Sequence, residues 1–79
     1  MPMPNHDLYR GALALLIRAR QAQGVTPADL AAKLGFELAF VLKYEEGRQR
    51  LDPAEYVAIA GAVGVDPYEL LQQAEDEAG

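Results

Sequence analysis

Apolar residues recur at steps of three and four along most of this chain, the spacing that gathers them on one face of an α-helix. The stripe is clearest in residues 7–23, where it contains Leu8, Ala12, Leu13, Leu16 and Ala19. Leu15 and Ile17 lie outside that stripe, so this helix is more apolar than one buried face requires. No segment alternates apolar and polar residues with the two-residue period of a strand. The pattern therefore predicts an all-α protein.

Local signals divide this pattern into five helices. Three times, a residue that can cap a helix precedes a proline suited to the first helical position, and an acid follows two residues after the proline. These starts are Thr26-Pro27, Asp52-Pro53 and Asp66-Pro67. The expected stops are glycines, which favour the left-handed conformation that ends a helix: Gly24, Gly35, Gly47 and Gly64. The predicted helices cover residues 7–23, 27–34, 38–46, 53–63 and 67–74.

The chain has 79 residues, enough for one hydrophobic core but not for two. We expect residues 1–6, which include two prolines, to form a flexible arm, residues 7–74 to form the domain, and residues 75–79 to form a frayed acidic tail. The second and third predicted helices are separated by a short turn that begins with Gly35. Two helices joined in this way form a helix-turn-helix unit.

Composition excludes several classes of chemistry. The chain has no cysteine, so disulfides, thiolate catalysis and sulfur metal sites are ruled out. It has no serine, and its one threonine, Thr26, is already assigned as a helix cap, while its one histidine, His6, falls in the predicted arm. Nucleophilic catalysis normally needs Ser, Cys, Thr or Lys held by a base. We therefore expect no enzyme activity, no cofactor and no metal site.

The sequence also lacks the features of a membrane or secreted protein. No apolar run approaches the roughly 20 residues of a membrane-spanning helix. The first residues do not combine a charged segment with an apolar one, as a secretory signal does. The expectation is a soluble cytoplasmic protein.

Charge is unevenly distributed along the chain, whose formal net charge is −5. Residues 1–50 hold all seven bases against five acids, a net charge of +2, whereas residues 51–79 hold seven acids and no base, a net charge of −7. One interpretation is a mildly positive face opposite a strongly negative end. An ordinary solvated acidic tail explains the same numbers, and the sequence leaves both open.

Residues 16–64 resemble the phage Cro/repressor-type helix-turn-helix domain, also called XRE-like. The resemblance is carried by Arg20 four residues before Gly24 and by the runs LAAKLG (30–35), VLKYEEG (41–47), RLD (50–52) and IAGAVGV (59–65). It implies a compact five-helix lambda-repressor-like domain and a transcriptional regulator that binds DNA, with the second helix of the motif in the major groove. It also implies a structural ion pair between Arg20 and Glu45.

The third predicted helix departs from the family at its outer face. At 100° per residue, Leu38, Ala39, Leu42 and Glu46 fall on one side and Phe40, Val41 and Tyr44 on the other. The second group matches the inward face of the family, so the first group, with Lys43 beside it, is the expected DNA or partner face. Relatives typically place polar or basic residues there, and a glutamine where this chain has Pro27. Direct base readout needs hydrogen-bonding side chains, so weak readout is expected.

Two functions therefore remain open. The first is a small regulator that binds DNA as a homodimer, with Lys33, Lys43, Arg48 and Arg50 as candidate phosphate contacts, although these four also fit plain surface charge. The second is a derived domain that no longer reads DNA and uses the apolar Leu38/Leu42 face for protein contact or self-association, as an anti-repressor or co-regulator would. A third explanation of that face, cover by residues 1–4 of the same chain, is also left open.

Overall fold

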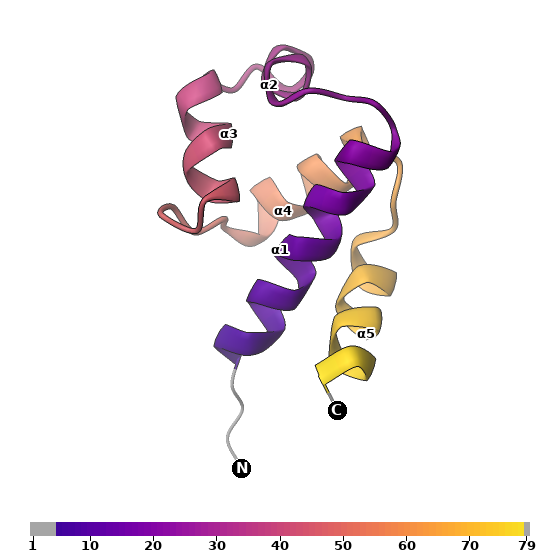
Figure 1. The fold of residues 1–79 in the computed structure, drawn as a ribbon. Coiled ribbons are helices and arrows are strands. Elements are labelled where there is room, and N and C mark those ends of the chain that lie inside the picture. Colours follow the sequence, from indigo (N-terminus) through magenta and orange to yellow (C-terminus); the bar gives the residue numbers. More distant parts are fainter. Residues whose placement is uncertain (1–4, 79) are drawn as a thin grey trace.

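The computed structural model describes residues 5–78, which form five α-helices and no strand (Figure 1). The helices are α1 (Asn5–Ala22), α2 (Pro27–Leu34), α3 (Leu38–Glu45), α4 (Pro53–Ala62) and α5 (Pro67–Ala78). The predicted all-α, five-helix fold is confirmed. Within the same residues, none of the helices is both long and apolar enough to cross a membrane.

The predicted helix starts form because each is capped by its own side chains. In α2, Asp29 N donates to Thr26 Oγ1 at 3.0 Å and Thr26 N donates to Asp29 Oδ2 at 3.2 Å. Asp52 and Glu55 form the same reciprocal pair at the start of α4. Such a cap satisfies backbone N–H groups that have no partner within the helix, which typically stabilises a helix by about 1 kcal/mol.

Two helix ends differ from the prediction. α1 begins at Asn5, so Asn5 and His6 of the expected arm are helical, while residues 1–4 lie outside the described residues. α5 continues through Ala78, beyond the expected end at residue 74. The physical reason is that α5 packs along α1 over much of its length, which stabilises both helices beyond their local signals (Figure 1).

Close approach of α1 and α5 depends on small residues. A Cβ placed on Gly11 would lie only 3.2 Å from the Cβ of Ala74, which is itself 3% exposed. A larger side chain at either position would push the two helices apart. The contact places α5 and its acidic end beside the first half of α1.

A single hydrophobic core joins all five helices. Its most completely buried large side chains are Tyr44, Leu16, Leu30, Ile59, Val41 and Val63. Leu13 and Leu15 are buried as well, because α1 packs against α5 on one side and against the rest of the core on another. Of the two apolar residues outside the predicted stripe, Leu15 is buried in the core and Ile17 packs against it while partly buried.

Candidate nucleic-acid interface

α3 presents one side to the core and the other to solvent. Val41 is fully buried and Tyr44 is 1% exposed, whereas Leu38 is 44% and Leu42 is 42% exposed. Ala39 and Glu46 are exposed on the same side as the two leucines. We call Leu38, Ala39, Leu42 and Glu46 the α3 outer face. Its expected outward orientation is confirmed.

The turn between α2 and α3 sets the direction of α3. Gly35 adopts the left-handed conformation, with φ 74° and ψ 23°, which ends α2 without the steric cost that a Cβ would bring. Phe36 N then donates to Ala31 O at 2.9 Å. The Phe36 ring packs edge-on against Phe40, with centroids 5.1 Å apart, and so anchors the start of α3.

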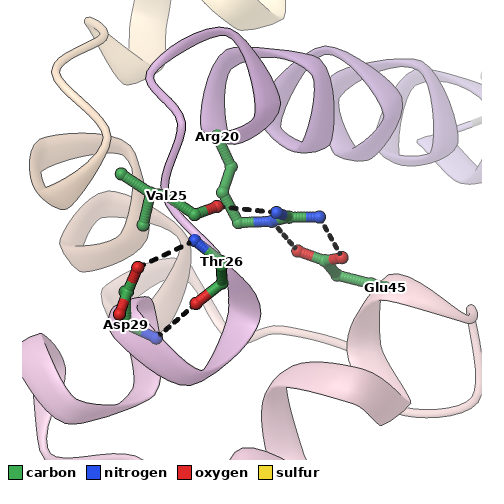
Figure 2. A network of polar contacts seen from close by, with 5 residues as sticks. All are labelled: Arg20, Val25, Thr26, Asp29 and Glu45. Carbon is green, nitrogen blue, oxygen red and sulfur yellow. Dashed lines mark hydrogen bonds and ion pairs between the residues drawn. The ribbon is translucent and has the colours of Figure 1, made fainter.

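A buried ion pair holds the other end of α3 (Figure 2). Arg20 Nε donates to Glu45 Oε2 at 2.7 Å, and Arg20 Nη2 donates to Glu45 Oε1 at 3.0 Å. The remaining guanidinium nitrogen, Nη1, donates to Val25 O at 2.7 Å. The two side chains are only 10% and 13% exposed. One arginine thus ties together α1, the turn before α2, and α3, and the structure brings together the two residues that the resemblance paired.

Burial also affects the tyrosine beside this pair. It raises the pKa of Tyr44, and the negative charge of Glu45 raises it further. The Tyr44 hydroxyl therefore stays neutral across the physiological range.

The candidate phosphate contacts form two groups in space. Lys43, Arg48 and Arg50 gather at the carboxyl end of α3 and in the linker to α4. Lys33 lies elsewhere, because its Nζ donates to Ala62 O at the last residue of α4, at 3.3 Å. α4 has ten residues and is therefore about 15 Å long. The linker lies before the first residue of α4, at the opposite end of the helix from Ala62. Lys33 is therefore not brought together with the other three.

Two of the three grouped bases already have partners. Arg48 Nε lies 3.4 Å from Glu46 Oε1, and both side chains are well exposed. The guanidinium carbon of Arg50 lies 4.3 Å from the centre of the Tyr9 ring, a cation–π contact. The ammonium of Lys43 has no such contact with the described side chains of residues 8–77. The positive charge at this end of α3 is therefore partly offset by the acid of the outer face.

Comparison with known proteins identifies this arrangement. A family model described as "Helix-turn-helix domain" matches residues 13–73. A solved structure of an XRE-family like protein from Pseudomonas syringae pv. tomato str. DC3000 is 40% identical, covers 91% of this chain and 88% of its own, and superimposes with a TM-score of 0.84. The chain belongs to the XRE-type helix-turn-helix family. No curated protein matches it.

Membership places this XRE-type domain in a family of DNA-binding regulators, in which helix-turn-helix proteins lay the second helix of the motif in the major groove. Leu38, Ala39 and Leu42 carry no hydrogen-bonding group, and Glu46 is an acceptor whose charge repels phosphate. The part that this face plays in binding stays a prediction.

Two residues of α1 that were not among the predicted site residues border this region. Tyr9 Oη accepts a hydrogen bond from Leu51 N at 3.1 Å, and its ring lies under Arg50, so it positions the linker. Arg10 lines a groove between α1 and the end of α3, together with Glu46 and Arg50. The apolar spacing of α1 shows only that Arg10 lies outside the apolar stripe. That spacing cannot indicate that residues about forty positions later in the chain lie beside Arg10.

Proposed function

We propose that this XRE-type domain is a small cytoplasmic transcriptional regulator, without catalytic activity, that binds DNA as a dimer and holds the duplex mainly by its phosphates, with weak direct base readout. The observation that carries the proposal is the composition of the α3 outer face. Its exposed residues are two leucines, an alanine and a glutamate. Leucine and alanine can meet thymine methyl groups, but they cannot make the paired hydrogen bonds that distinguish bases by about 1–3 kcal/mol each.

The available charges suit phosphate contacts. Lys43 belongs to the last turn of α3, Arg48 and Arg50 belong to the linker that follows it, and Arg10 lines a groove together with Arg50. Three or four phosphate contacts per protomer support salt-dependent binding of low selectivity. A dimer doubles that number, and it matches the two half-sites, about 34 Å apart, that helix-turn-helix dimers occupy.

A salt titration of duplex binding tests this proposal. With a random-sequence duplex and with fragments of the source genome, we expect the logarithm of the binding constant to fall linearly with the logarithm of salt, by roughly 3 to 4 units per protomer. Arg48→Ala and Arg50→Ala should each reduce this slope by about one unit on every sequence alike. Lys33→Ala is the matched comparison and should leave the slope unchanged, because Lys33 points to Ala62. Absence of binding at about 50 mM salt would refute DNA binding.

The exposure of Leu38 and Leu42 favours a second candidate, a derived domain that contacts protein through the α3 outer face. Full burial of a leucine is worth roughly 1.5–3 kcal/mol, and more than two fifths of each side chain is still exposed. Such a domain would serve as an anti-repressor or co-regulator, and the acidic residues 66–79 would add attraction to a basic partner.

Replacing both leucines separates the two candidates. Leu38→Ser with Leu42→Gln should shift the sedimentation profile toward monomer and abolish partner pull-down if this face binds protein. It should leave non-specific duplex binding nearly unchanged if phosphates carry the affinity. An unchanged sedimentation profile together with unchanged pull-down would count against the protein-contact candidate.

A further inference from the structure

A second feature of the domain lies away from the α3 outer face, in a groove of about 340 Å³ between α1, the linker and the neighbouring parts of α4 and α5. We call it the α1–α4–α5 groove. Its walls are mostly hydrocarbon, and the apolar residues that line it are Leu8, Tyr9, Ala12, Leu13, Leu51, Pro53, Tyr56 and Leu71. Leu8, Tyr9, Tyr56 and Leu71 are only half-buried, so the groove is open to solvent. Its volume is at the low end of the roughly 300–1,000 Å³ of ligand pockets, which favours a small ligand.

The polar groups of the groove are nearly all occupied by the fold itself. Tyr9 Oη accepts from Leu51 N, and Tyr56 Oη donates to Pro67 O at 2.6 Å. Asp52 Oδ1 accepts from Glu55 N at 2.7 Å as the cap of α4. These contacts bind the linker and the starts of α4 and α5 together. They leave few polar groups to recognise a ligand.

Arg50 is the exception. Its guanidinium lies over the Tyr9 ring, and among the described side chains of residues 8–77 it has no hydrogen-bond or ion-pair partner. The cation–π contact does not use the N–H donors of the guanidinium, whose planar arrangement matches a carboxylate. Asp52 is the acid in the lining, and its charge is already engaged with the amino end of α4, where a negative charge is stabilised.

We propose that the α1–α4–α5 groove binds a small amphipathic monocarboxylate, with its hydrocarbon body on Leu8, Leu13 and Leu71 and its carboxylate on the Arg50 guanidinium. Arg50 favours an anion because its N–H donors are open to a ligand, whereas the Asp52 carboxylate of the same lining already accepts from Glu55 N. The apolar walls select a hydrocarbon body over a sugar or an inorganic anion. The cation–π contact with Tyr9 restrains the guanidinium before the ligand arrives, which lowers the ordering cost of binding.

The site has a regulatory consequence that rests on the proposed function. Arg50 is also a candidate phosphate contact at the end of α3. A bound carboxylate would occupy the charge that the duplex needs, so ligand and DNA would each weaken the binding of the other by the same factor. The groove would then make DNA binding responsive to a small acid.

Titration of the full chain with octanoate, followed by amide NMR shifts without DNA, tests the site directly. We expect shifts at Tyr9, Leu51 and Leu71 and a dissociation constant of about 1 mM or below. Octan-1-ol, which has the same chain and no charge, should bind about tenfold more weakly. Arg50→Gln should weaken octanoate about tenfold and leave octanol unchanged, because it removes the charge and keeps the groove.

Two variants control for charge and for the apolar wall. Arg48→Gln removes the same charge two residues away, outside the groove, and should leave octanoate affinity unchanged. Leu8→Gln, at the half-buried rim, should weaken octanoate and octanol alike. Circular dichroism checks that each variant is folded.

Three outcomes would overturn the proposal. One is equal affinity for octanoate and octanol. Another is a set of shifts centred on Leu38 and Leu42, which would mean adsorption to the α3 outer face. The third is octanoate binding that occurs only after removal of residues 1–4, which would mean that the chain fills its own groove. None of these outcomes depends on DNA binding, so failure here is distinguishable from failure of the proposed function. If both hold, octanoate should flatten the salt slope by about one unit per protomer.

Discussion

At the scale of single residues, Arg20 is the side chain on which the position of α3 most depends. It donates to both carboxylate oxygens of Glu45 and to the carbonyl of Val25. Arg20→Ala would leave a largely buried carboxylate and a carbonyl without their partner. We expect the free energy of unfolding to fall by about 3 kcal/mol, measured by urea denaturation at pH 7.

Arg18→Ala is the matched control, because Arg18 is exposed on the same helix. It should change the free energy of unfolding by less than about 0.5 kcal/mol. A loss of under about 1 kcal/mol for Arg20→Ala, the size expected of a surface ion pair, would contradict the structural role.

Tyr44 gives a prediction for alkaline pH. Burial, and after it the charge of Glu45, raises the pKa of this hydroxyl in the folded state above the value of about 10 in the unfolded chain. The associated stability is fully present below pH 10 and is lost as the pH rises through the folded-state pKa. Burial raises the pKa of Tyr56 in the same direction. The urea midpoint should therefore fall above about pH 10.

Tyr44→Phe isolates this effect. The variant should lose less stability between about pH 10 and 11 than the unaltered chain, and it should differ little at pH 7, because the Tyr44 hydroxyl makes no hydrogen bond with the described side chains of residues 8–77. An identical alkaline loss in both proteins would show that Tyr44 does not titrate in this way.

At the scale of elements, the α3 outer face carries a negative charge beside the positive charge of the linker. Glu46 lies 3.4 Å from Arg48 and competes with phosphate for it. Glu46→Gln should therefore strengthen duplex binding at a given salt concentration, because Arg48 no longer has to give up an ion pair in order to contact phosphate. Glu37→Gln removes the same charge at the other end of α3 and should strengthen binding less. An equal gain in affinity in both variants would point to net charge alone.

Elements whose signals are local could be predicted from the sequence. The starts of α2 and α4 depend on two capping pairs, Thr26 with Asp29 and Asp52 with Glu55, whose members are three residues apart in the sequence. The outer face of α3 follows from helical periodicity alone. The start of α1 and the end of α5 could not be predicted, because they depend on packing between opposite ends of the chain.

At the scale of the whole molecule, the candidate site is assembled from residues far apart in sequence. Arg50 meets Tyr9 and Lys33 meets Ala62 only in the folded chain. Periodicity places each residue on a face of its own helix but does not say which helix comes to cover it. The sequence therefore indicated the four candidate phosphate contacts as one set. In the folded chain, Lys33 lies at the last residue of α4, whereas the other three lie before its first residue.

For the molecule as a whole, we propose that this XRE-type domain binds DNA with its α3 outer face against the duplex yet reads few bases. Selection of bound duplexes from a random-sequence library, at about 50 mM salt and followed by sequencing, tests this proposal. We expect recovery of many sequences, with enrichment of any one base at a given position of no more than about tenfold. A sharp consensus that binds about a thousandfold more tightly than the unselected library would contradict it.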